Sequence, residues 1–307
     1  MTKVLIHEVG PRDGLQIEKA TVPTETKIAW IEKILESGVD VVQLGSFVNP
    51  ERVPQMADTE QLFRYFASAE RKPSKTALSG LVLNEKGLDR GLGCGVDYVC
   101  MGVSASDTHS RKNTGMSTEE ALSRIVPMAL RAGAAGARVQ VSVMSAFGCG
   151  FEGPVAFDRV MRIVGRYVEA GLKMISLADT AGHANPAQVE ELFTKLRTLA
   201  PDVLYACHFH DTYGLGLANA FAAYRVGVES FESAVAGLGG CPFTAVTGGN
   251  IATEDLVHMF ARMNVRRDVE LDPLIDAAKQ AEQFLGRPLP GRIHVTGPVP
   301  EHELVTV

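Results

Sequence analysis

Apolar residues along this chain gather in short runs, and each run follows directly on a helical stretch that ends in glycine. EKILESG-VDVVQLG shows the pattern, which recurs in GLGCG-VDYVCMG, RAGAAG-ARVQVSV, YVEAG-LKMISLA and YRVG-VESFESAV. Glycine just past a helix supplies a left-handed C-cap, and a strand then follows through a short loop. The runs are nearly continuous and do not alternate with polar residues, which is typical of parallel strands covered on both faces.

Counting these runs predicts eight strands, with helical patterns between them. The strands are expected near residues 4–9, 40–45, 76–82, 97–103, 138–144, 173–178, 204–209 and 231–236. Helices are expected over residues 24–37, 118–132, 157–170 and 186–200, and several begin with a Thr, Ser or Asn cap and carry glutamate in the first turn.

Eight βα units without a linker predict an α/β fold of the (β/α)8 TIM-barrel type, with residues 1–307 as one catalytic domain. No G-x-G-x-x-G follows the first strand, which argues against a dinucleotide-binding fold. The segment from about 272 to 307 is predicted to form an extra C-terminal helix and a tail packed on the barrel.

Composition narrows the class of protein. The chain is 46% hydrophobic and 21% charged, as in ordinary globular proteins, and its net charge of −6 argues against a nucleic-acid or membrane partner. No apolar run approaches the roughly 18 residues that a membrane span needs, and because a strand is expected within the first few residues, we expect no remaining signal or transit peptide. Five scattered cysteines without a C-x-x-C pair indicate reduced thiols in the cytoplasm.

The candidate chemistry lies at strand ends, where barrel enzymes keep their active sites. The first strand leads into GPRDG, which predicts a tight turn holding Arg12 beside Asp13, although a surface salt bridge would give the same pattern. His208 and His210 are two residues apart on the seventh strand, so both side chains face the same side. Asp13, both histidines and the amide oxygen of Asn250 can converge on a divalent metal ion, Mg²⁺, Mn²⁺ or Zn²⁺.

The loop after the eighth strand, GLGGCPFTAVTGGN, is glycine-rich and long for a βα connection. It carries Cys241, whereas the other four cysteines have the character of small buried residues. A loop of this kind can act as a lid over the barrel mouth. Cys241 would then serve as a general acid or base, and the alternative is an inert thiol on a loop.

EVGPRDGLQ, SFVNPERVPQMAD, SLADTAG, HFHDTYG and GLGGCPF…GGNIATEDLV together resemble the 3-hydroxy-3-methylglutaryl-CoA lyase family of metal-dependent TIM-barrel lyases. The likeness covers nearly the whole chain in order. It implies that Asp13, His208, His210 and Asn250 bind the metal, that Arg12 is a catalytic arginine and that Cys241 is the acid/base cysteine. It also implies an acyl-CoA substrate and a homodimer.

The residue types fit that chemistry. The metal would orient the substrate hydroxyl and ease its deprotonation, and Arg12 would stabilise the acetyl-CoA enolate formed when the C2–C3 bond breaks. Cys241 would return a proton to the enolate carbon. Asp13, a ligand histidine or a bound water is the group that takes the hydroxyl proton. Further candidates for substrate or CoA contacts are Gln43, Ser46, Lys112, Asn113, Ser176 and Asp179.

Gln43 departs from the family pattern, which usually has a glutamate near the metal at this position. The loss of a negative charge leaves two substrates open, 3-hydroxy-3-methylglutaryl-CoA and a relative such as citramalyl-CoA, which would give pyruvate and acetyl-CoA. A condensing synthase or aldolase and a non-catalytic binding protein are the remaining alternatives. The retained Arg12, Asp13 and Cys241 argue against the last of these.

Overall fold

Eight parallel strands close into a barrel in sequence order, and β1 pairs with both β2 and β8. The structure is a computed structural model, and it describes residues 4–68, 70–240 and 249–300. The strands are β1 (Leu5–Glu8), β2 (Val41–Ser46), β3 (Ala77–Leu81), β4 (Tyr98–Ser104), β5 (Arg138–Met144), β6 (Met174–Asp179), β7 (Leu204–Phe209) and β8 (Ser230–Ser233). The predicted (β/α)8 TIM barrel is confirmed.

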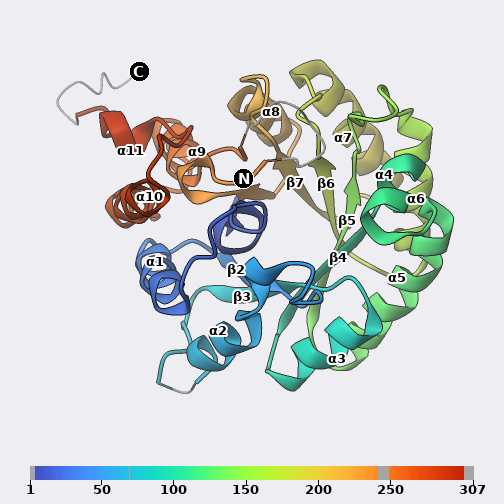
Figure 1. Cartoon of the computed structure of the whole chain (residues 1–307). Helices are drawn as coiled ribbons and strands as arrows, with labels where there is room; N and C mark the ends of the chain where they lie inside the picture. The colour runs from blue at the N-terminus through green and yellow to red at the C-terminus, as the bar shows by residue number, and fades with distance from the viewer. Residues whose placement is uncertain (1–3, 69, 241–248, 301–307) are drawn as a thin grey trace.

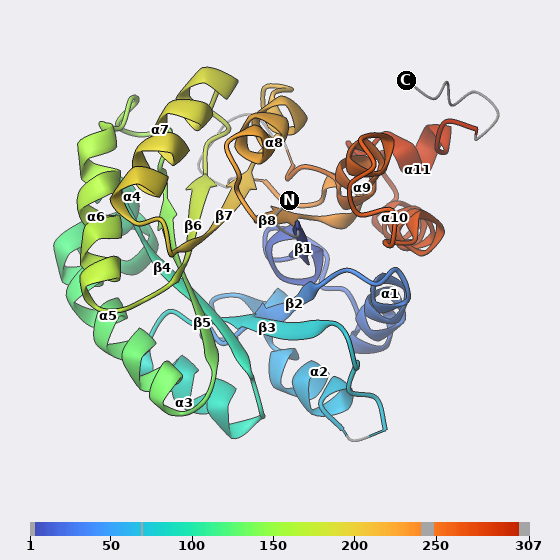
Figure 2. The same cartoon turned by 180° about the vertical axis from the view of Figure 1, so that it is seen from behind.

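Helices surround the barrel, as Figures 1 and 2 show from opposite sides. They are α1 (Thr24–Glu36), α2 (Thr59–Phe66), α3 (Glu85–Gly93), α4 (Asp107–Thr114), α5 (Thr118–Ala134), α6 (Phe157–Glu169), α7 (Pro186–Leu199), α8 (Gly216–Arg225), α9 (Thr253–Arg262), α10 (Leu271–Leu285) and α11 (Ile293–Thr296). Capping boxes begin α5 at Ser117 and α7 at Asn185, which explains why these helix starts could be predicted.

The eighth strand ends earlier than predicted. β8 stops at Ser233, and Val235–Gly237 forms a short 3-10 turn in which Ala236 has a left-handed φ of 58°. There, two buried carboxylates accept the backbone hydrogen bonds that a neighbouring strand would otherwise accept. Glu8 Oε1 accepts a hydrogen bond from the Val235 N–H at 3.0 Å, and Glu254 Oε2 accepts one from the Ala236 N–H at 3.0 Å.

The extra C-terminal helix is present as α10, which packs against α1 on the outside of the barrel (Figure 1). The short helix α11 follows it and is fixed by His294, whose Nδ1 lies 2.9 Å from Glu254 Oε1. The C-terminal region therefore lies against the β8–α9 side of the barrel as far as residue 300. The last residues of the predicted tail, 301–307, are outside the described part.

The two faces of each strand differ more than predicted. Outward residues such as Ile6, Val42 and Phe231 belong to one apolar core between the strands and the helices. Inward positions are buried as well, but many are polar, including His7, Gln43, Ser79, Gln140, Ser176 and Glu232. The expectation of strands without alternation therefore holds only in part for the inward face, where these polar residues lie beside a smaller apolar cluster of Val41, Tyr98 and Cys100.

Within 4–68, 70–240 and 249–300, no helix is both long enough and apolar enough to cross a membrane. Cys94, Cys100, Cys149 and Cys207 are buried free thiols, as predicted from their surroundings.

Candidate active site and metal centre

Arg12 and Asp13 are carried on one turn of π-helix, Gly10–Gly14, that follows β1 directly. The Val9 carbonyl accepts hydrogen bonds from the N–H groups of Asp13, at 2.7 Å, and Gly14, at 3.4 Å. Single π-turns occur often at functional sites. The sequence predicted a tight turn here, and the wider π-turn places both charged side chains at the C-terminal end of the barrel, where they are 11% and 12% exposed.

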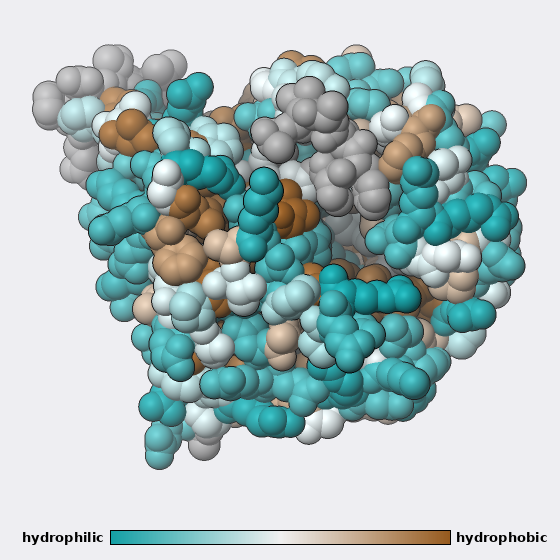
Figure 3. All heavy atoms as spheres, viewed as in Figure 1, coloured by the Kyte–Doolittle hydropathy of each residue, from teal (hydrophilic) through white to brown (hydrophobic). Residues whose placement is uncertain are grey.

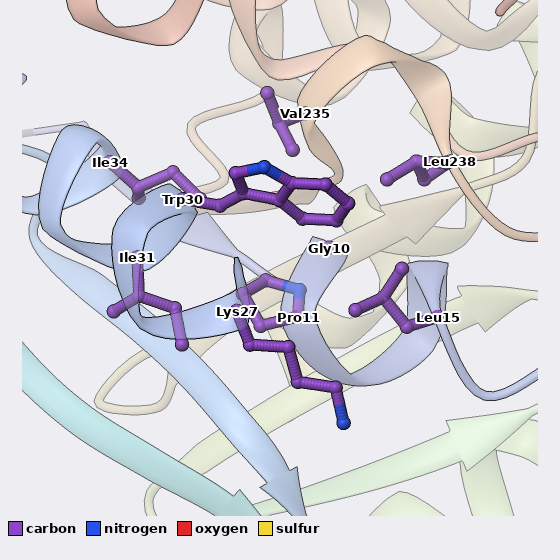
Figure 4. Close-up of a pocket in the computed structure, with 9 residues that line it drawn as sticks. All are labelled: Gly10, Pro11, Leu15, Lys27, Trp30, Ile31, Ile34, Val235 and Leu238. Atoms are coloured by element: carbon purple, nitrogen blue, oxygen red, sulfur yellow. The ribbon is translucent and has the colours of Figure 1, made fainter. Parts of the chain in front are cut away.

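The turn is held by apolar packing against α1 and the loop after β8, as Figure 4 shows. Trp30 of α1 and Leu238 flank it around a cavity of about 10 Å³, which is too small for a substrate. An added Cβ at Gly14 would lie 2.8 Å from Leu238 Cβ, so the contact requires a glycine. The residues around this cavity therefore hold the turn that carries Arg12 and Asp13.

His208 and His210 extend from the end of β7 toward Asp13. Their Nε2 atoms lie 3.2 Å apart, and each lies within 4 Å of Asp13 Oδ2, at 3.8 Å and 3.9 Å. All three side chains are buried, and their ligand atoms lie within 4.8 Å of one another. The structure thus brings together the carboxylate and the two imidazoles that the strand-end argument selected.

Hydrogen bonds on the far side of each ring determine which nitrogen faces the cluster. His208 Nδ1 lies 2.9 Å from Glu232 Oε2, and His210 Nδ1 lies 3.0 Å from the Thr180 carbonyl oxygen. A carbonyl and an ionised carboxylate only accept hydrogen bonds, so both Nδ1 atoms carry the hydrogen. Both Nε2 lone pairs therefore point at the same place, an arrangement typical of histidines that bind a metal.

Asn250 completes the cluster from the loop after β8. Its Nδ2 donates to Asp13 Oδ2 at 2.9 Å and to the Leu238 carbonyl at 2.8 Å. Its Oδ1 is buried and has no hydrogen-bond partner among the described residues. A buried acceptor without a donor, two facing lone pairs and a carboxylate together form a donor set that fits a divalent cation of the Mg²⁺, Mn²⁺ or Zn²⁺ type.

The electrostatics of the cluster favour a cation. Burial alone would raise the pKa of Asp13, but Arg12 and the two histidines hold it well below its usual range, so Asp13 is ionised. Burial lowers the pKa of His208, yet the hydrogen bond to Glu232 and the charge of Asp13 outweigh burial and raise it. Despite its burial, Glu232 has a pKa of about 2 because of His208. Two buried carboxylates therefore surround the imidazoles.

Arg12 is fixed between two acceptors. Its Nη1 donates to Asp13 Oδ1, and its Nε donates to Gln43 Oε1. Gln16 Nε2 also donates to Asp13 Oδ1, at 3.1 Å. Gln43 thus contacts Arg12, and a β-bulge between Gln43 and Gly45 shifts the register of β2 at this point.

The remaining predicted residues lie in three different settings. The Ser176 hydroxyl donates to Glu232 Oε1 at 2.9 Å inside the barrel, and Asp179 accepts from the backbone N–H groups of His183 and Ala184. Ser46 is buried at the end of β2. Lys112 and Asn113 are exposed on α4, with Lys112 Nζ 4.4 Å from the centre of the Phe151 ring, and they belong to the rim and not to the cluster.

Cys241 lies outside the described residues, so its role stays a prediction. The described loop residues before and after it border a cavity of about 520 Å³. This cavity is lined by Ile17, Glu18, Lys19, Ala20, Gly237, Leu238, Gly239, Gly249, Leu285, Arg287, Leu289 and Pro290. Gly239 also approaches Asn250, because an added Cβ would lie 2.6 Å from Asn250 Nδ2. The cavity therefore adjoins the cluster.

Sequence reasoning missed Glu232 and Thr180, which orient the histidines. Glu232 was detectable as a carboxylate in the middle of the apolar run VESFESAV, one strand away from the histidines. Thr180 was not detectable, because it contributes a backbone carbonyl whose position depends on the fold.

Comparisons with known proteins agree with this geometry. A family model described as HMGL-like matches residues 3–280. A hydroxymethylglutaryl-CoA lyase of Bacillus subtilis is 39% identical over 290 residues, which cover 94% of this chain and 96% of that protein. An (R)-citramalyl-CoA lyase of Chloroflexus aurantiacus is 39% identical over 305 residues, which cover 97% of this chain and 96% of that protein.

Solved structures show the same similarity in three dimensions. The crystal structure of the Bacillus subtilis HMG-CoA lyase superposes with a TM-score of 0.90 at 38% identity, covering 96% of this chain and 97% of that one. An HMG-CoA lyase from Acinetobacter baumannii, in complex with coenzyme A and 3-methylmalate, has a TM-score of 0.90 at 34% identity and covers 99% and 98% of the two chains. The resemblance seen in the sequence is confirmed, and the chain belongs to the HMGL-like family.

Proposed function

We propose that this protein is a carbon–carbon lyase that cleaves 3-hydroxy-3-methylglutaryl-CoA to acetoacetate and acetyl-CoA. The observation that carries the proposal is the convergence of Asp13, His208 and His210 beside Arg12 at the barrel mouth. This arrangement occurs in a chain that is 39% identical to a hydroxymethylglutaryl-CoA lyase over 94% of its length.

Asp13, His208, His210 and Asn250 are the residues that would hold a divalent cation, Mg²⁺ or Mn²⁺, with Zn²⁺ as the alternative. Such an ion supplies Lewis acidity, which makes the substrate hydroxyl easier to deprotonate. The chain prepares the site by fixing both histidine tautomers through Glu232 and the Thr180 carbonyl. Carboxylate, imidazole and amide oxygen suit ions of this class.

We assign to Arg12 the stabilisation of the negative charge that develops during cleavage. When the hydroxyl proton leaves, the C2–C3 bond breaks, its electron pair moves into the acetyl thioester, and the thioester oxygen becomes an enolate oxygen. Gln43 and Asp13 fix the Arg12 guanidinium, and two of its five N–H donors serve in those bonds. The others have no hydrogen-bond partner among residues 4–68, 70–240 and 249–300, and we assign them to the enolate oxygen. A proton then returns to the enolate carbon, and Cys241 is the proposed donor.

The CoA part of the substrate needs contacts at the edge of the mouth. The sequence predicted Lys112 and Asn113, which lie on α4, as such contacts. The cavity of about 520 Å³ beside Gly239 is a second location, lined by the cationic side chains of Lys19 and of Arg287, which is paired with Glu18 at 2.6 Å. Figure 3 shows that the face seen in Figure 1 is largely hydrophilic, as suits a charged acyl-CoA. The relative with bound coenzyme A supports an acyl-CoA substrate for this chain.

An assay of the purified protein with Mg²⁺ or Mn²⁺ tests the proposal. We expect acetyl-CoA and acetoacetate from 3-hydroxy-3-methylglutaryl-CoA, measured by thiol-ester turnover and by mass. Citramalyl-CoA is the competing substrate, and pyruvate is its product. One hydroxymethylglutaryl-CoA lyase and one (R)-citramalyl-CoA lyase are each 39% identical to this chain, so sequence identity does not favour that alternative. If the protein cleaves neither substrate, the proposal is overturned.

Domain, assembly and compartment are proposed on the same basis. Residues 1–307 would form one catalytic domain, which the packing of α10 against α1 supports. We expect a homodimer, to be tested by light scattering. The four described cysteines are free, which supports a reducing compartment such as the cytoplasm.

A further inference from the structure

A row of polar side chains crosses the barrel interior beneath the candidate metal ligands. It begins at Tyr98 on β4, whose hydroxyl donates to Gln140 Oε1 at 2.9 Å. Gln140 Nε2 donates to Glu232 Oε1 at 2.6 Å, and the Ser176 hydroxyl donates to the same oxygen at 2.9 Å. The row ends at His208, whose Nδ1 lies 2.9 Å from Glu232 Oε2.

Glu232 occupies the central position of this row. It lies directly opposite His208 in the β7–β8 pairing, and its side chain is buried, with 8% exposure. Each of its oxygens has a defined partner. Oε1 receives two donors from β5 and β6, which leaves Oε2 directed at the His208 ring. A buried carboxylate with this set of bonds cannot turn away from the histidine without losing two others.

We propose that Glu232 is a positioning residue for the metal centre, and that it acts through His208 and not on the substrate. It accepts the Nδ1 hydrogen, keeps the Nε2 lone pair toward Asp13 and His210, and makes the imidazole a better ligand. Gln140 and Ser176 serve it by holding the carboxylate in place. The inference rests on the proposed function only in requiring that the cluster binds a divalent cation.

The test is a titration of the metal-free protein with Mn²⁺ alone. Binding is monitored by calorimetry or by the electron paramagnetic resonance signal of free Mn²⁺. Glu232→Gln keeps the size of the side chain and removes its charge, and Glu232→Ala removes it entirely. We expect Mn²⁺ affinity to fall about tenfold in the first variant and up to about 100-fold in the second. Far-UV circular dichroism and the melting temperature of each variant show whether the barrel remains folded.

Ser79→Ala is the matched control. Ser79 is a fully buried polar residue of the same interior, but its hydroxyl pairs with His7 Nε2 at 2.8 Å and makes no bond to Glu232. Its loss should leave Mn²⁺ affinity within about twofold of the wild type. An equal loss of affinity in Ser79→Ala would mean that any polar change in the interior disturbs the site, which would overturn the specific role of Glu232.

A second readout does not depend on metal. In protein labelled with ¹⁵N-histidine, long-range ¹H–¹⁵N spectra show which ring nitrogen carries the hydrogen, and His208→Gln assigns the resonance. We expect His208 to be protonated on Nδ1 in the metal-free wild type at pH 8, and to populate the Nε2 tautomer in Glu232→Ala. Unchanged Mn²⁺ affinity and an unchanged tautomer would refute the proposal, as would a wild type that binds no Mn²⁺. Failure of the proposed function would appear differently, as normal Mn²⁺ binding without cleavage of any acyl-CoA.

Discussion

Arg12→Gln is the perturbation that tests the proposed chemistry most directly. The guanidinium is buried, held by Gln43 and Asp13, and adjacent to the metal cluster. At an effective dielectric constant near 20, a unit charge about 4 Å from the enolate oxygen contributes roughly 4 kcal/mol. This corresponds to about 10³-fold in rate, which agrees with the loss seen when a preorganised donor is removed. We therefore expect kcat to fall about 10³-fold in Arg12→Gln.

Two further measurements separate this role from others. Arg12→Lys keeps the charge but cannot bond Gln43 and Asp13 together as the planar guanidinium does, so its kcat should lie between those of the wild type and Arg12→Gln. Mn²⁺ affinity should stay the same or increase in Arg12→Gln, because a cation beside the cluster is removed. An unchanged kcat with a raised KM would refute the reasoning and make Arg12 a substrate anchor.

The remaining predictions concern the metal, the loop thiol, the substrate and pH. His208→Ala should lose Mn²⁺ affinity and turnover but keep its fold, and full turnover after exhaustive chelation would exclude a catalytic metal. Cys241→Ser should lose most of its turnover while Cys207→Ala should not, and equal effects on kcat would deny Cys241 a chemical role. Gln43→Glu should shift the ratio of kcat/KM values toward 3-hydroxy-3-methylglutaryl-CoA over citramalyl-CoA by about tenfold. A tenfold shift needs about 1.4 kcal/mol, and a buried charge supplies more. An unchanged ratio would contradict this prediction. Burial lowers the pKa of His7 from 6.5 to about 4, so the unfolded chain binds its proton first as the pH falls. Wild-type stability should therefore drop by up to about 3 kcal/mol more than that of His7→Asn between pH 6.5 and 4, measured by urea unfolding.

The barrel could be predicted because its signals are local. Glycine after a helix, followed at once by an apolar run, marks each αβ junction, and the strand positions agree to within a few residues. β8 is the exception. Its end depends on Glu8 and Glu254, which accept the backbone hydrogen bonds of Val235 and Ala236 from elsewhere in the chain. A strand boundary set by distant side chains leaves no trace in its own residues.

The site residues also divide into those that the sequence could predict and those that it could not. Asp13, His208 and His210 could be selected because strand ends meet at one mouth, so position along each strand was enough to bring them together. The groups that prepare them could not be selected, because they depend on the register between strands. Glu232 meets His208 only through the pairing of β7 with β8, and Gln140 meets Glu232 across the barrel from β5.

The polar interior explains why this barrel is suited to hold a cation at its mouth. An apolar interior would leave His208 Nδ1 without an acceptor, and a buried imidazole would then be free to adopt either tautomer. Here the inward faces of β5, β6 and β8 supply Gln140, Ser176 and Glu232, whose hydrogen bonds settle the tautomer before any ligand arrives. The apolar face of the same strands, turned to the helices, maintains stability. Because the period of a strand is two residues, these three side chains lie on the face opposite the helix-facing core, and their substitution should change metal affinity more than it changes folding.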